Sequence, residues 1–114
     1  MEQKEKPQGD EKLAGRVVGI AGLVDYQDGS IVSRQIISKG AGTVTLFAFD
    51  RGQGLSEHTA PFDALVYVFD GEAEVVIAGN SHHLSAGEMV IMPANKPHSL
   101  SAVRKFKMML IMVR

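Results

Sequence analysis

The chain has 114 residues, no cysteine, and 12 Lys and Arg residues against 13 Asp and Glu residues. This length fits one domain with a genuine core, and the lack of cysteine excludes disulfides, thiolate metal sites and cysteine nucleophiles. Because so little net charge would steer the protein toward a polyanion, neither a nucleic acid nor a membrane surface is expected as a partner.

The first twelve residues, MEQKEKPQGDEK, are polar and carry seven charges. They do not resemble a secretion signal, and no later stretch reaches the roughly 18 apolar residues that a membrane-spanning helix needs. We therefore expect a solvated, disordered tail over residues 1–12, one domain over residues 13–114, and a cytoplasmic protein.

From residue 30 onward, short apolar runs rich in Val, Ile and Phe alternate with turn signals. This spacing predicts an all-β sandwich or barrel, and no long window keeps a helical period. Gly79-Asn80 is the candidate for a tight hairpin turn, because both residues tolerate a positive φ. Strands are expected at residues 31–38, 43–50, 64–70, 72–78, 81–85, 88–93, 98–103 and 106–113.

Both faces of the last predicted strand are apolar. Its side chains form two sets, one of Phe106, Met108, Leu110 and Met112 and the other of Met109, Ile111 and Val113. A strand at the surface of a monomer normally alternates apolar and polar residues, so we expect a homodimer to cover the second face. The alternative is that residues 13–24 of the same chain cover it.

Five of the six methionines fall in the last 26 residues: Met89, Met92, Met108, Met109 and Met112. Flexible thioethers fill irregular core space and line adaptable pockets, and they are also ligands for Cu(I). On apolar strands, packing in the core is the simpler interpretation.

Two stretches carry glycine, histidine and proline at a recognisable spacing. Residues 52–71 read GQGLSEHTAPFDALVYVFDG, and residues 87–102 read GEMVIMPANKPHSLSA. In their order and spacing they resemble the two motifs of the cupin superfamily. The resemblance implies an all-β, double-stranded β-helix or jelly-roll barrel. It also implies an inward-facing metal that cupins typically hold with three histidines and a glutamate.

The ligand positions of the cupin motifs are only partly kept. His58 and His98 match two of the histidine positions, whereas Ala60 and Ala64 occupy the positions of the remaining histidine and the glutamate. Asn95 replaces a motif glycine, and asparagine can adopt the left-handed backbone that such a turn requires. His58 and His98 are therefore the two candidate ligands that the resemblance leaves.

A divalent ion such as Fe, Mn, Ni or Zn would need a third protein ligand beside His58 and His98. Asp63 lies one residue from the glutamate position and would face inward if the strand were bulged, and Gln35 is a weaker candidate. Glu57 is expected to face away from His58. The alternative is a metal-free pocket in which the two histidines are hydrogen-bonded to each other, to water or to main chain.

The interior of the barrel is the expected ligand pocket. Alternate residues of a strand share a face, which places part of the first motif inside the barrel. The expected lining is His58, Ala60, Ala64, Phe47, Phe49, Val66 and His98. His82 and His83 are expected at the rim or in solvent. The basic group of Arg104, Lys105 and Lys107 is interpreted as a solvated strand entry, with binding of an anion as a minor alternative.

These observations favour a small cupin barrel that binds a small molecule, with no reaction assigned. The alternative function is a divalent-metal-dependent enzyme of the isomerase or dioxygenase type that uses His58 and His98. A sensory module fused to a helix-turn-helix domain is not expected, since the sequence has no pattern for one.

Overall fold

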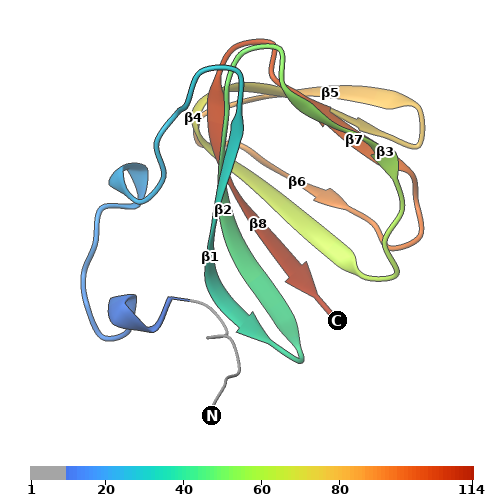
Figure 1. The fold of residues 1–114 in the computed structure, drawn as a ribbon. Coiled ribbons are helices and arrows are strands. Elements are labelled where there is room, and N and C mark those ends of the chain that lie inside the picture. The colour runs from blue at the N-terminus through green and yellow to red at the C-terminus, as the bar shows by residue number, and fades with distance from the viewer. Residues whose placement is uncertain (1–9) are drawn as a thin grey trace.

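The computed structural model describes residues 10–114, and residues 1–9 lie outside the described part (Figure 1). Two short 3-10 helices, η1 (Glu11–Leu13) and η2 (Ile20–Gly22), precede the strands. The strands are β1 (Ile31–Lys39), β2 (Gly42–Phe49), β3 (Gly54–His58), β4 (Asp63–Ile77), β5 (Asn80–Ser85), β6 (Met89–Met92), β7 (His98–Ser101) and β8 (Phe106–Val113). The prediction of an all-β barrel is confirmed. Among residues 10–114, none of the helices is long and apolar enough to cross a membrane.

The long strand β4 joins the two sheets of the barrel. Its first part pairs with β6 and β8, whereas its second part, from Glu72 to Ile77, pairs with β5 and β7. One sheet therefore has the order β1-β2-β8-β4-β6, and the other has the order β5-β4-β7-β3, with antiparallel pairing throughout. We call them the five-stranded and the four-stranded sheet.

Gly71 lies where β4 passes from one sheet to the other. The sequence predicts a turn here that separates two strands, and this prediction is wrong because β4 continues through the glycine. Gly71 has a φ of 76°. A Cβ at this position would overlap the carbonyl oxygen of Lys105 and lie 2.8 Å from Cα of Phe106. Only glycine combines this backbone with so close an approach, so it bends the strand without ending it.

Two further local predictions need correction. The tight turn falls on Ala78 and Gly79, because Ile77 and Asn80 still pair with each other. Both turn residues have positive φ, as a two-residue hairpin turn of the primed type requires. Strand β3 is absent from the predicted set, since its polar sequence GLSEH lacks an apolar run, and it forms an edge that pairs with β7.

The main core lies between the two sheets. Phe49 and Phe106 are cross-strand partners on β2 and β8, and their rings stack with centroids 4.5 Å apart. Both rings are fully buried, as are Val66, Val68 and Val75. Burial of side chains of this size is the main source of stability in a domain of this length. The aromatic pair fills the barrel interior toward the first residue of β8.

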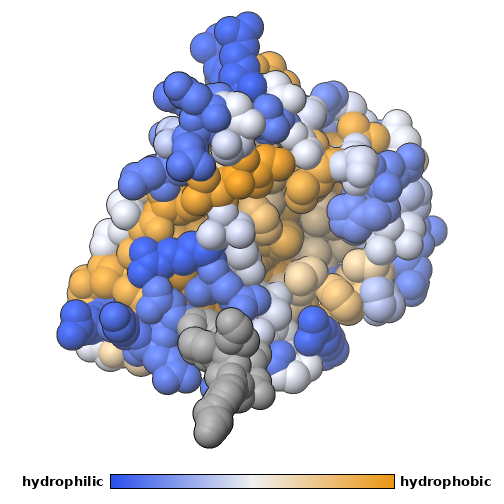
Figure 2. Space-filling view, viewed as in Figure 1, coloured by the Kyte–Doolittle hydropathy of each residue, from blue (hydrophilic) through white to orange (hydrophobic). Residues whose placement is uncertain are grey.

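A second apolar cluster lies on the outer face of the five-stranded sheet. Val24 and Leu23, which precede β1, pack there with Leu46, Ala48 and Met109. The N-terminal segment thus covers Met109, as the alternative to the homodimer expects, but that cluster leaves out Ile111 and Val113. Figure 2 shows hydrophobic residues in a band among hydrophilic ones on one face of the molecule.

Residues 10–12 of the expected tail are described and lie against β1. The backbone N–H of Asp10 donates to the carbonyl of Ile36 at 2.9 Å, and the Asp10 carboxylate accepts a hydrogen bond from Nε of Arg34 at 2.9 Å. Arg34 also donates to the Leu23 carbonyl. The guanidinium of Arg34 therefore connects two parts of the N-terminal segment to the sheet. The first nine residues of that expected tail lie outside the described residues.

Candidate functional site

His58 and His98 are brought together at one end of the four-stranded sheet. They are cross-strand partners on β3 and β7, and their imidazole rings meet edge to face with centroids 4.5 Å apart. His98 is buried, at 4% exposed, whereas His58 is exposed. One imidazole therefore belongs to the barrel interior and the other stands at its mouth.

Hydrogen bonds to main chain orient both imidazole rings. Nδ1 of His58 lies 2.8 Å from the Ser56 carbonyl oxygen, and Nδ1 of His98 lies 3.1 Å from the Lys96 carbonyl oxygen. A carbonyl oxygen only accepts, so Nδ1 is the donor in both rings, and the neutral imidazole then keeps its lone pair on Nε2. Each histidine thus has one nitrogen anchored and one left for a ligand.

Burial is the main reason that the pKa of His98 is lowered from its usual value, and the nearby His58 lowers it further. The hydrogen bond to the Lys96 carbonyl acts in the opposite direction. His98 is therefore neutral at neutral pH, with Nε2 able to accept a hydrogen bond or to bind a metal.

A cavity of about 50 Å³ lies next to the histidine pair. It is lined by Leu55, His58, Ala60, Ala64, Met92, His98, Leu100, Met108, Leu110 and Met112. Apart from the two imidazoles the lining is apolar, and it comes from both sheets. Such a site suits a small ligand with few polar atoms.

Four of the seven expected pocket residues meet at this cavity: His58, Ala60, Ala64 and His98. The other three lie elsewhere in the interior: Phe49 and Val66 are fully buried in the core, and Phe47 packs against it. The methionines were not among the residues expected to line the pocket. Alternate residues of a strand face the same side, so Met108, Leu110 and Met112 share one face of β8. This alternation in the sequence could have placed them in the pocket.

A three-ligand divalent centre of the cupin type does not fit these residues. Ala60 and Ala64 present methyl groups where the family motif has donors. Asp63 is exposed, does not line the cavity, and accepts a hydrogen bond from the Ala94 N–H at 2.9 Å. Over residues 10–114 no group of three His, Cys, Asp or Glu side chains is placed to hold a metal ion. The cavity lining offers two imidazoles and no carboxylate.

The remaining candidate residues lie away from the cavity. Gln35 and Glu57 are exposed. His82 and His83 are exposed on β5, where Nε2 of His83 pairs with Glu72 at 2.9 Å. Asn95 has a φ of 66°, which confirms the expected left-handed turn, and its N–H donates to the carbonyl of Ala60, a residue that lines the cavity.

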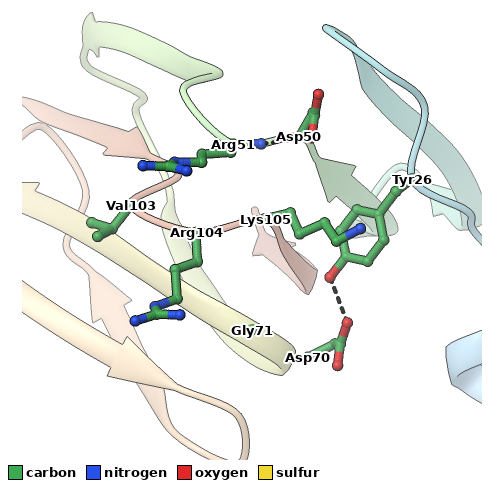
Figure 3. A pocket seen from close by; sticks show the side chains of 8 residues that line it. All are labelled: Tyr26, Asp50, Arg51, Asp70, Gly71, Val103, Arg104 and Lys105. Carbon is green, nitrogen blue, oxygen red and sulfur yellow. Dashed lines mark hydrogen bonds between the residues drawn. The ribbon is translucent and has the colours of Figure 1, made fainter.

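A second, larger depression of about 810 Å³ lies beside the first residues of β8, in the region of the predicted basic group (Figure 3). It is lined by Tyr26, Asp50, Arg51, Asp70, Gly71, Val103, Arg104 and Lys105. The Tyr26 hydroxyl donates to Asp70, and the Lys105 ammonium lies 4.8 Å from the centroid of the Tyr26 ring. In Figure 3, Arg51 and Arg104 point away from this ring.

Contacts in this depression tie the segment before β1 to the barrel. The Asp50 carboxylate accepts the Gly29 N–H at 2.7 Å and the Arg51 N–H at 2.8 Å, and these donors lower the pKa of Asp50. Burial and the bond to Asp70 raise the pKa of Tyr26, so its hydroxyl stays protonated as the donor. We therefore assign these groups to anchoring the N-terminal segment.

Comparison with solved structures places the chain among small cupin barrels. A conserved protein of unknown function from Streptococcus pyogenes is 31% identical, with 88% of each chain covered and a TM-score of 0.84. A cupin 2 conserved barrel domain protein from Leptotrichia buccalis is 40% identical over 82% of this chain and 46% of that chain, with a TM-score of 0.80. A cupin superfamily protein from Desulfitobacterium hafniense is 24% identical, with 87% and 91% of the two chains covered and a TM-score of 0.82.

The comparison with curated protein sequences found no match. The family model described as Cupin domain matches residues 45–114, which include both histidines, the whole of β4 and the strands that line the cavity. The match agrees with the two-sheet barrel and with the motif spacing seen in the sequence. The chain therefore belongs to the cupin domain family.

Proposed function

We propose that this cupin is a binding protein whose barrel cavity takes up a small, mainly apolar molecule that donates a hydrogen bond to His58 or His98. The main support is that Nδ1 of both histidines is hydrogen-bonded to a main-chain carbonyl, beside an apolar cavity. Because Nδ1 donates to main chain in each ring and leaves Nε2 as the acceptor, the ligand must bring an O–H or N–H group. A cavity of about 50 Å³ limits the buried part of the ligand to a few heavy atoms.

The alternative, a divalent-metal enzyme, draws its support from the family alone. One fold of this kind carries many unrelated activities, so membership does not assign a reaction. Catalytic zinc sites generally use three protein ligands, and iron oxygenases use two histidines with a carboxylate. Here the acidic candidate for a third ligand, Asp63, accepts a hydrogen bond from the Ala94 amide. A binding function, in contrast, needs only the residues that already line the cavity.

The experiment is a fragment titration of the metal-free protein, observed through the methionine methyl signals. Small alcohols, phenols and amides serve as donors, and their O- or N-methylated forms serve as matched compounds without the donor. We expect the donors to shift the methyl signals of Met92, Met108 and Met112 but not that of Met89, which is 52% exposed and outside the cavity. Equal shifts from donors and methylated forms would refute the role of the histidines.

Elemental analysis of untagged protein separates the two functions. The binding proposal expects no stoichiometric Fe, Mn, Ni or Zn after purification or reconstitution. A near-stoichiometric divalent ion that disappears in both His58→Ala and His98→Ala would establish the enzyme alternative instead. Ser81→Ala is a matched surface variant that leaves the site unchanged, since Ser81 is exposed on β5 and does not line the cavity.

We also propose that a second copy of this chain covers the outer face of the five-stranded sheet. Registered cross-strand pairs connect one apolar residue from each of its strands, so all five point to the same side: Ile37, Val44, Ile111, Leu65 and Ile91. Ile37 is 47% exposed and Ile91 is 52% exposed. The row crosses the whole sheet without a charge, and a copy of itself offers a matching surface in a two-fold dimer.

Light scattering coupled to size exclusion tests the dimer. We expect a dimer mass at micromolar protein and a monomer mass for Ile111→Glu, because Ile111 lies at the centre of the row. Val103→Glu changes another exposed valine, which lies on the loop before β8 and outside the row, and it should leave the mass unchanged. A monomer mass for the unmodified chain would refute the proposal.

A further inference from the structure

The cavity beside the histidine pair is lined by three thioethers as well as two imidazoles. Met92 and Met108 are buried and Met112 is half-buried, and all three line the same cavity as His58 and His98. Met89 and Met109 do not line it. The methionines near the end of the sequence thus divide into those that face the histidines and those that do not.

The register of the five-stranded sheet explains why the thioethers converge. Ala64 on β4 has Met92 of β6 as its partner on one side and Met112 of β8 on the other. Directly opposed residues of neighbouring strands project to the same face. The methyl group of Ala64 occupies little of the space between the two long side chains, so both can enter the cavity. The position that holds a carboxylate in the family motif is thereby flanked by sulfur.

The chemistry of this set points to one kind of metal ion. Thioethers are soft ligands that select Cu(I), and imidazole also binds copper, whereas Mg, Ca and Mn prefer carboxylate, carbonyl or water oxygen. Both histidines present a free Nε2, while their Nδ1 atoms donate to carbonyl oxygens. The same anchoring of the second ring nitrogen is usual for histidines that bind a metal. The residues that do not fit a divalent centre thus match the ligand preferences of a soft ion.

We propose that the cavity binds one Cu(I) ion through Nε2 of His58 and His98 together with thioether sulfur from Met92 or Met112, the two methionines that flank Ala64. The inference rests on the proposed function, because both place the ligand in the same cavity. It adds a soft monovalent ion as a second ligand. Copper and the hydrogen-bond donor use the same lone pairs, so the two ligands compete. The exposed His58 lies at the mouth, where an ion enters from solvent.

The test is an anaerobic titration of the purified chain with Cu(I) in competition with bicinchoninate, a chromogenic Cu(I) chelator. We expect one ion per chain, and X-ray absorption should show both nitrogen and sulfur neighbours. The double variant Met92→Leu with Met112→Leu keeps the apolar volume and removes two sulfur atoms. Its affinity should fall by about tenfold or more, within the range that perturbing a metal site usually costs.

Two matched variants locate the ion. Met89→Leu removes an exposed thioether outside the cavity and should leave the affinity unchanged. The double variant His82→Ala with His83→Ala removes the exposed histidines of β5 and should also leave it unchanged. Failure of the unmodified chain to retain Cu(I) would overturn the proposal. So would unchanged retention in the Met92/Met112 double variant, or loss in the His82/His83 variant.

The outcome is separable from that of the proposed function because the fragment titration uses metal-free protein. If donor fragments shift the methionine methyl signals and Cu(I) is not retained, the copper inference is wrong and the binding function stands. If Cu(I) is retained and no donor fragment binds, the small-molecule proposal is wrong and the cavity is a metal site only. Displacement of a bound donor by Cu(I) would support both.

Discussion

The two ends of the barrel interior share strand β8 and differ in how they are filled. At one end Phe49 and Phe106 face each other across β2 and β8 and leave no space between their stacked rings. At the other end Ala64 faces two methionines, and the cavity remains beside His58 and His98. The size of a few inward side chains thus separates a part of the barrel that stabilises the fold from a part that can bind.

The Phe106→Ala substitution tests the filled end and should have the largest effect. Removing a fully buried aromatic ring that stacks on Phe49 loses both transfer free energy and packing, which typically costs about 3–5 kcal/mol. Urea denaturation followed by circular dichroism measures the loss. A cost below about 1 kcal/mol would show that the two ends do not differ in their contribution to stability.

The Gly71→Ala substitution tests the bend in β4, which lies beside Phe106 at the filled end of the barrel. The added Cβ would lie 2.8 Å from Cα of Phe106, and the φ of 76° is strained for alanine. Backbone strain of this kind costs about 1–3 kcal/mol, and the overlap with Lys105 adds to it. The same denaturation measurement applies, with Gly79→Ala as the comparison, because a Cβ at Gly79 meets no atom within 4 Å although its φ is also positive. An equal loss of stability at both positions would show that the positive φ, and not the overlap with Lys105, causes the effect.

Lowering the pH should destabilise the histidine end through His98. Because its folded-state pKa lies below the unfolded value of about 6.5, its contribution is fully present above that value and is lost as the pH falls toward the folded pKa. The free energy of unfolding should decrease between pH 7.5 and 5.5 by no more than about 1.4 kcal/mol per pH unit from this group. The His98→Asn variant should show a flatter profile, and an identical profile would contradict the assignment.

The Ala64→Leu substitution tests the open end and should have the smallest effect on stability. The larger side chain enters a cavity that already exists, so we expect a cost at the lower end of the about 1–3 kcal/mol that added methylenes usually cause. Binding of donor fragments should be abolished, because the side chain then occupies their space. Retained fragment binding in this variant would place the site outside the cavity. Ala60→Ser is the comparison variant, because it adds one polar atom to the same cavity lining in place of a large side chain.

Motif spacing in the sequence was enough to predict the barrel and the pairing of two histidines. His58 and His98 were the candidates that the motif left, and they are cross-strand partners. The left-handed turn at Asn95 was also foreseen, since asparagine tolerates that backbone. Strands with clear apolar runs, such as β2 and β8, were predicted within one residue. The strands and the turn depend on local geometry, which neighbouring residues determine, whereas the pairing of the two histidines followed from the family motif.

The sequence by itself therefore determined the strand content, the family and the two imidazoles of the candidate site. The tertiary structure decided that Gly71 bends a continuous strand, that Phe49 and Val66 belong to the core, and that Met92 and Met112 meet beside Ala64. These outcomes depend on the register between strands that are distant in sequence. A shift of one residue would turn each side chain to the opposite face, and local sequence does not determine that register.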